Sequence, residues 1–221
     1  MSPGARFCYL EQVRTKRVVS ERTGARERLL ATSAEVFRES GYRAASLDDI
    51  LRRSGVAKSN FYYHFAGKLQ LACAAVDLWA EQLGAALLAP LEDPSRSGLE
   101  RLRGFVASFE GVCSSGAIGC PFGMLAAEDD LESELRERVQ NVLGRVESSL
   151  ASALRDGQRD GSIRPDADAQ EFSGVLLAAL QGASLIARAA REPARIAATA
   201  TPLLALLAAK PAARRPRPSR G

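Results

Sequence analysis

Apolar residues recur along the chain at the three- and four-residue intervals of an amphipathic helix, and no stretch alternates with the period of two that marks a strand. Glycine and proline interrupt this pattern at several points, where we expect helices to end. The pattern therefore predicts an all-α fold of about nine helices. The predicted helices cover residues 24–40, 46–54, 58–65, 68–88, 99–113, 124–128, 129–159, 167–190 and 193–208.

Only about three residues separate the second predicted helix from the third. Ser46 is a good N-cap, because its hydroxyl can accept a hydrogen bond from an unpaired backbone N–H, and Gly55 tolerates the left-handed conformation of a tight turn. In the third helix Val56, Phe61 and Phe65 can face a core. Its other side chains then form a polar and aromatic face that suits the major groove of DNA. That face consists of Lys58, Ser59, Asn60, Tyr62, Tyr63 and His64.

An ordinary helical hairpin is the alternative interpretation of these residues, and a family resemblance argues against it. The segment from Gly24 to Trp79, and above all the run GVAKSNFYYHF at 55–65 followed by Gly67 and Lys68, resembles the N-terminal DNA-binding domain of TetR/AcrR-family transcriptional regulators. The match covers about a quarter of the chain with its spacing intact. It implies a three-helix helix-turn-helix domain followed by a larger helical domain that binds a ligand and dimerises.

The resemblance also assigns roles within the helix-turn-helix. Lys58, Ser59 and Asn60 are implied to meet base edges or nearby phosphates, and Tyr62, Tyr63 and His64 to hold the sugar-phosphate backbone. Two further phosphate contacts are implied for Ser46 and Lys68, on either side of the recognition helix. The chain departs from the family at Leu69, where an acidic residue is common, and this predicts a less well capped start to the fourth helix.

Charge is unevenly distributed along the chain. Residues 1–68 hold 13 Lys and Arg against 7 Asp and Glu, and residues 210–221 hold five basic and no acidic residues. Because the whole chain carries only +4, the middle is acidic. The basic front coincides with the helix-turn-helix, as double-stranded DNA requires of a partner. We therefore expect a flexible basic segment at 1–23, the DNA-binding domain at 24–68, an effector-binding and dimerisation domain at 69–208, and a disordered basic tail at 209–221.

The last two predicted helices are too apolar to be solitary surface helices. In the resembled family the equivalent pair forms a four-helix bundle with a partner subunit, which implies a homodimer and a near-palindromic operator. The alternative is that the pair packs only within one subunit. The expected interface residues are Phe172, Val175, Leu176, Ala179, Ala183, Ile186, Leu203 and Leu206.

A ligand pocket is expected among the helices between Leu71 and Ala190. Apolar side chains predict a small and mostly hydrophobic effector, whereas Glu110 or Glu128 on the wall would favour a cation. The same side chains can equally be plain core. The expected pocket residues are Trp79, Phe105, Phe109, Cys113, Phe122, Met124 and Glu128.

Other chemistry finds little support in the sequence. The four cysteines form no CxxC pair and His64 is the only histidine, so we expect no metal and no cofactor. Cys113 and Cys120 leave open an alternative, a regulator that senses oxidants or electrophiles through thiols. With no nucleophile motif and no phosphate-binding glycine loop, an enzyme is not expected.

No uninterrupted apolar run of about 18 residues and no signal peptide are found, which predicts a cytoplasmic protein without a membrane partner. The overall prediction is a one-component repressor that a small ligand releases from its operator. A helical dimerisation module without DNA binding is the remaining alternative from another class.

Overall fold

The computed structural model describes residues 24–114 and 118–209, so the predictions for the basic N-terminal segment and for most of the basic tail lie outside the described residues. Within the described ranges the chain forms nine α-helices and no strand, apart from an isolated bridge between Ile163 and Ala208. The predicted all-α fold class is confirmed. The helices are α2 (Ala25–Ser40), α3 (Leu47–Ser54), α4 (Lys58–His64), α5 (Lys68–Glu92), α6 (Gly98–Ser114), α7 (Pro121–Ala126), α8 (Ser133–Asp160), α9 (Ala169–Ala190) and α10 (Arg195–Leu207).

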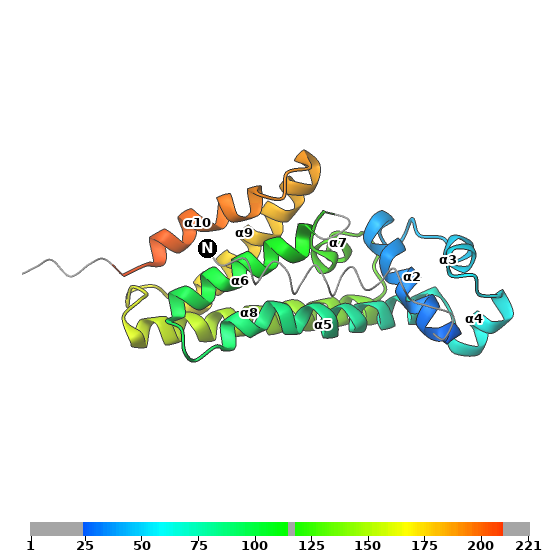
Figure 1. Cartoon of the computed structure of the whole chain (residues 1–221), viewed down its shortest axis with the longest axis horizontal. Helices are drawn as coiled ribbons and strands as arrows, with labels where there is room; N and C mark the ends of the chain where they lie inside the picture. The colour runs from blue at the N-terminus through cyan, green and yellow to red at the C-terminus, as the bar shows by residue number, and fades with distance from the viewer. Residues whose placement is uncertain (1–23, 115–117, 210–221) are drawn as a thin grey trace, which may run out of the picture.

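The molecule is elongated, with a small head at one end and a larger body (Figure 1). The head consists of α2, α3 and α4, and the body of α5 to α10. Helix α5 leaves the head and runs along the body beside α8, while α6, α9 and α10 lie across the other side. Because α2 packs on α5 as well as on α3 and α4, the head is attached to the body through more than one element.

Helix α2 follows its predicted pattern closely. Leu29, Val36 and Phe37 are buried, and the helix ends where Gly41 takes a φ of 83° and donates its N–H to the carbonyl of Phe37. Only glycine adopts this left-handed conformation without strain. The loop that follows, residues 41–46, turns the chain into α3 and also faces the body.

Helix α5 is longer than predicted. We expected it to end near Leu88, before Pro90, but it continues to Glu92 with Pro90 inside it. Only a single turn surrounds and follows the proline, so few backbone hydrogen bonds are lost. The last turn is held by packing, because Leu91 is buried and a Cβ on Gly104 of α6 would lie 2.9 Å from the Cβ of Pro90.

Helix α8 is shorter than predicted at its start. The expected start was residue 129, but Asp130 has a φ of 53°, which no α-helix accommodates, and the helix begins at Ser133. The turn between α7 and α8 is therefore free to contact the head instead of extending α8. It carries Glu128 and Glu132, which both contact Tyr42 of the head.

Two helices of the body, α5 and α9, are long and apolar enough by length and composition to cross a membrane, although charged residues interrupt both. Core helices of helical proteins satisfy the same criterion. Here α5 packs on α6 and α8, and α9 packs on α8 and α10, so both contribute to the core of the body.

Candidate DNA-binding surface and internal cavity

The turn between α3 and α4 has the geometry that its sequence predicted. The Ser46 hydroxyl accepts a hydrogen bond from the N–H of Asp49 at 3.0 Å and caps α3. Gly55 has a left-handed backbone, with φ 65° and ψ 24°, and donates its N–H to the carbonyl of Leu51. Two residues, Val56 and Ala57, then lead into α4, which begins at Lys58.

Helix α4 has one buried and one exposed face. Phe61 is fully buried and Phe65 nearly so, and their rings stack with centroids 5.9 Å apart. On the other face, 54% of the surface of Tyr62 and 83% of that of Tyr63 are exposed, so neither ring belongs to the core. The structure thus brings the predicted residues of this helix together on one surface. Lys58, Ser59 and Asn60 are exposed, and His64 is half-buried with its ring against that of Tyr63.

Lys68 requires a correction to its predicted role. Its ammonium group donates to the carbonyls of Tyr42 and Ala45 at 2.9 and 3.1 Å and lies 4.4 Å from the centre of the Tyr42 ring. The side chain therefore fastens the loop between α2 and α3 to the start of α5, and its charge is already engaged inside the head. Spacing from the recognition helix did not reveal this, because the loop that holds the ammonium lies more than twenty residues earlier in the sequence.

The start of α5 is weakly capped, as the departure at Leu69 predicted. Its N-cap is Gly67, no acidic residue lies in its first turn, and no side chain caps it. Instead the side-chain carbonyl of Gln70 reaches back to accept from the N–H of Ala66 at 2.6 Å.

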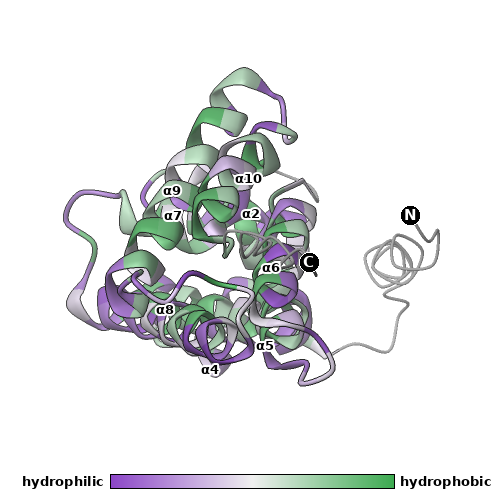
Figure 2. Cartoon of the chain, turned by 90° about the vertical axis from the view of Figure 1, so that its left-hand side faces the viewer, coloured by the Kyte–Doolittle hydropathy of each residue, from purple (hydrophilic) through white to green (hydrophobic). Residues whose placement is uncertain are grey.

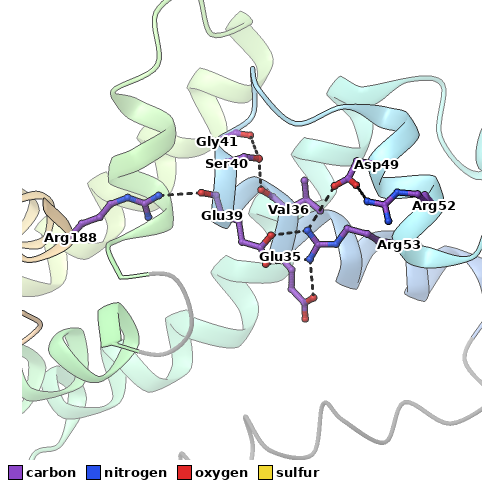
Figure 3. Close-up of polar contacts among 9 residues, drawn as sticks. All are labelled: Glu35, Val36, Glu39, Ser40, Gly41, Asp49, Arg52, Arg53 and Arg188. Carbon is purple, nitrogen blue, oxygen red and sulfur yellow. Dashed lines mark hydrogen bonds and ion pairs between the residues drawn. The ribbon is translucent and has the colours of Figure 1, made fainter. Parts of the chain in front are cut away.

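An ion cluster that the sequence did not single out locks α2 to α3. The Arg53 guanidinium pairs with Glu39 at 2.7 Å and lies within 4.0 Å of Glu35 and 3.8 Å of Asp49 (Figure 3). The hydrogen bond from Arg53 lowers the pKa of Glu39. Glu35 and Glu39 stand four residues apart on one face of α2, so their spacing was a signal for such a partner. Arg53 belongs to the scaffold of the head.

The body has a small apolar cavity, partly open to solvent, among α5, α6, α7, α8 and α9. Its volume is about 30 Å³, which is room for little more than water, so a larger molecule can enter only if the walls move. Of the predicted pocket residues, Phe105, Phe109 and Phe122 line it. The lining also includes residues that the sequence did not suggest: Ala80, Gly84, Leu87, Leu88, Cys120, Val142, Leu143, Arg145, Val146, Leu177 and Gln181.

Four predicted pocket residues do not line this cavity, and each has other contacts. Trp79 packs edge-on against Phe122 with centroids 6.2 Å apart, and Cys113 is fully buried. The sulfur of Met124 lies 3.2 Å from the guanidinium of Arg188. The Glu128 carboxylate accepts from the N–H groups of Tyr42 and Arg43, so it serves the junction with the head and supplies no negative charge to the cavity.

The thiols offer little support for a redox sensor. Cys113 and Cys120 are both buried, and burial raises the pKa of each thiol well above its ordinary value. The thiolate is the reactive form of cysteine. A buried thiol that keeps its proton reacts slowly with oxidants and electrophiles, so the thiol-sensing alternative is not supported.

Helices α9 and α10 are largely apolar along their length (Figure 2), and some of their apolar side chains are exposed while others are buried. Val175, Ile186 and Leu206 are at least half exposed, whereas Phe172, Ala179 and Leu203 are half-buried. Leu176 and Ala183 need correction as interface residues, because both are buried inside the subunit. The sequence pattern could not separate the two faces, since apolar residues occur on both of them. Leu185, 62% exposed, belongs to the outer face and was missed.

Comparison with known proteins agrees with the geometry of the head and body. Residues 29–75 match the family described as bacterial regulatory proteins, tetR family, and residues 98–203 match the tetracyclin repressor-like C-terminal domain. The regulator LmrA of Bacillus subtilis is 31% identical over 185 residues, which cover 81% of this chain and 91% of LmrA.

Two further relatives extend this result. The repressor DhaR of a Mycobacterium species is 27% identical over 165 residues, which cover 74% of this chain and 82% of DhaR. A TetR-family regulator from Agrobacterium tumefaciens has the same fold, with a TM-score of 0.78 at 24% identity over 84% of this chain and 98% of that one. The two family matches together cover more than half of the chain, and LmrA matches most of it. The chain therefore belongs to the TetR family of bacterial transcriptional regulators.

Proposed function

We propose that this regulator is a homodimeric repressor in the cytoplasm that binds a near-palindromic operator and is released by a small, mostly hydrophobic molecule. The observation that carries the proposal is the outer face of α4. A short helix that exposes a lysine, a serine, an asparagine and two tyrosines, while a pair of stacked phenylalanines holds it in place, suits recognition of a DNA groove better than packing in a core.

Each exposed residue of α4 has a role in this proposal. Lys58, Ser59 and Asn60 lie in the first turn, the part of a recognition helix that reaches base edges. Tyr62, Tyr63 and His64 lie further along and would contact the sugar-phosphate backbone. Ser46 caps α3 through its oxygen and keeps its hydroxyl hydrogen available for a phosphate.

The dimer follows from the outer face of α9 and α10. Its exposed apolar side chains are the kind that a twofold interface buries, and two copies of the chain would present two recognition helices to one face of DNA. Repression, rather than activation, is supported by the name of the relative DhaR, a transcriptional repressor. No catalytic role is proposed.

The ligand would bind in the cavity that the start of α7 helps to line. Its apolar lining favours a hydrophobic molecule, with the amide of Gln181 and the guanidinium of Arg145 as the polar groups at hand. Because the cavity is small, an occupant must displace its walls, and a ligand releases DNA only by favouring the displaced arrangement.

A gel-shift titration with the DNA upstream of the protein's own gene tests the proposal. Asn60→Ala should weaken operator binding by about tenfold or more, since a good base contact contributes about 1–3 kcal/mol. Lys58→Ala, which removes a positive charge that base edges or nearby phosphates would meet, should weaken it as well. Asn141→Ala, which truncates an exposed asparagine on α8, is the matched control and should bind as the parent chain does. If the parent chain shifts no fragment, or if both α4 variants bind as the control does, the proposal fails. A reporter driven by the same DNA then separates repression from activation.

A further inference from the structure

The loop between α2 and α3 is held by the body through its own backbone. The Glu128 carboxylate, two residues beyond the end of α7, accepts from the N–H of Tyr42 at 2.6 Å and from the N–H of Arg43 at 2.9 Å. Both bonds are charge-assisted, which makes them stronger than bonds between neutral groups. No side chain of the head is needed for this contact, so it depends on the path of the loop.

Gly41 is adapted to the same carboxylate. Its φ of 83° strains any other residue, and a Cβ at this position would lie 2.6 Å from the Oε1 atom of Glu128. The glycine therefore serves both the end of α2 and the close approach of Glu128. Two separate features of the loop therefore accommodate the Glu128 carboxylate: the N–H groups of Tyr42 and Arg43 donate to it, and Gly41 has no side chain to displace it.

Other contacts at this junction come from the same region of the body. The Tyr42 hydroxyl donates to Glu132 at 2.8 Å, and the Arg38 guanidinium donates to the carbonyl of Val112 at 2.8 Å. Arg188 of α9 donates to the carbonyl of Glu39 at 3.2 Å, and Figure 3 shows it reaching the end of α2 from the body side. The partners in the body thus lie at the end of α6, at the start of α8 and at the end of α9.

Helix α7 lies between the cavity and this junction. Cys120 and Phe122, at its start, line the cavity, and Glu128 follows its last turn. At six residues α7 is far shorter than α5, α6, α8 and α9, the other walls. As the shortest of these walls, and the one that ends next to Glu128, α7 is the wall whose displacement would reach the junction.

We propose that Glu128 is a positioning residue that sets the orientation of the head on the body, and that α7 carries displacement of the cavity wall to it. An occupant that pushes α7 outward withdraws the carboxylate from the N–H groups of Tyr42 and Arg43, and the head loses its fixed orientation. The part that concerns ligand release rests on the proposed function. The part that concerns the head and the body does not.

The direct test is amide hydrogen exchange in the full chain without DNA. The N–H groups of Tyr42 and Arg43 should be protected in the parent chain and should exchange at least about tenfold faster in Glu128→Gln, since a hydrogen bond to a charged group contributes about 1.5–3 kcal/mol. Glu137→Gln removes the same charge from an exposed position on α8 and should leave both amides protected. Unprotected amides in the parent chain, or equal exchange in the two variants, would overturn the proposal.

Coupling to the cavity is tested by a double-mutant cycle on operator affinity. Val142→Phe adds volume to the cavity wall and stands in for an occupant. It should weaken operator binding by about fivefold in the parent chain and by less than about twofold in the Glu128→Gln background, because the contact that it disturbs is already gone. A merely structural role for Glu128 predicts additive effects, and additivity would overturn the coupling.

A second variant tests whether the effect of Glu128→Gln comes from the lost contact or from a general loss of structure. Gly41→Ala should displace the same carboxylate from the other side and give the same loss of coupling, while circular dichroism checks that each variant remains helical. If the parent chain shows no operator binding at all, the proposed function fails, and amide exchange still decides whether Glu128 holds the head.

Discussion

At the scale of single residues, Lys58 and Lys68 carry the same charge and stand ten residues apart, yet their surroundings differ. Lys58 is exposed at the start of α4, whereas the ammonium of Lys68 contacts three carbonyls and one aromatic ring of the loop between α2 and α3. An exposed lysine keeps its charge available for a phosphate. A lysine whose ammonium donates to backbone carbonyls of a neighbouring loop contributes to the stability of the head instead.

This difference predicts separable defects. Lys68→Met should lower the free energy of unfolding by about 2 kcal/mol, because it leaves the carbonyls of Tyr42 and Ala45 without their charged donor. Lys58→Ala should leave thermal stability unchanged and reduce the slope of log affinity against log salt by about one. Thermal melts and salt titrations of both variants provide the measurement. A Lys68→Met protein that melts with the parent chain contradicts the structural role.

At the scale of elements, the crossing of α6 and α8 depends on two glycines. A Cβ on Gly98 would overlap the backbone of Gly157, and a Cβ on Gly157 would overlap the side chain of Ile163. The N–H of Gly98 also donates to Asp160 at 2.7 Å. The two backbones approach so closely here that no side chain fits between them, which fixes the start of α6 against the end of α8.

Gly98→Ala should therefore destabilise the chain by about 1–3 kcal/mol, the usual cost of forcing extra volume into a packed site. Gly144→Ala is the matched control, since a Cβ there would meet nothing within 4 Å. Alanine favours a helix over glycine by about 0.8–1.0 kcal/mol, so this control should be neutral or more stable. Chemical denaturation measures both. If Gly98→Ala and Gly144→Ala have the same free energy of unfolding, the backbones of α6 and α8 can move apart at little cost, and the close approach does not fix the start of α6.

At the scale of the whole molecule, α9 and α10 belong to the body, and α4 lies in the head at the other end of the molecule (Figure 1). Ile186 and Leu206 are 55% and 66% exposed, while neighbouring positions on the same helices are buried in the subunit. The homodimer proposed above would use the exposed positions.

Ile186→Glu should convert the dimer to a monomer and weaken operator binding, because an interface that buries an unpaired carboxylate loses several kcal/mol. Light scattering measures the mass, and a gel shift measures the affinity. Gln140→Glu adds the same charge to an exposed position on α8 and should leave the dimer intact. A dimer that survives at Ile186→Glu and also at Leu206→Glu would place the interface elsewhere.

The sequence by itself determined the local features of this protein. Ser46, Gly41 and Gly55 set the ends of helices through their own hydrogen bonds and backbone angles, and the spacing of Phe61 and Phe65 decided which face of α4 stays exposed. These features depend on residues within a few positions of each other, so pattern and composition are enough to predict them. The family resemblance then supplied the arrangement of head and body.

Only the tertiary structure decided which long-range partner each remaining side chain meets. Trp79 and Phe105 are equally plausible pocket residues by sequence, yet only Phe105 lines the cavity. Lys68 and Glu128 both contact the loop between α2 and α3, although they lie 26 and 86 residues beyond Tyr42 in the sequence. Leu176 and Ile186 share one helix but lie on different faces. Periodicity reports the face on which a side chain stands, whereas the neighbour that it meets depends on how distant helices cross, and no local pattern encodes that crossing.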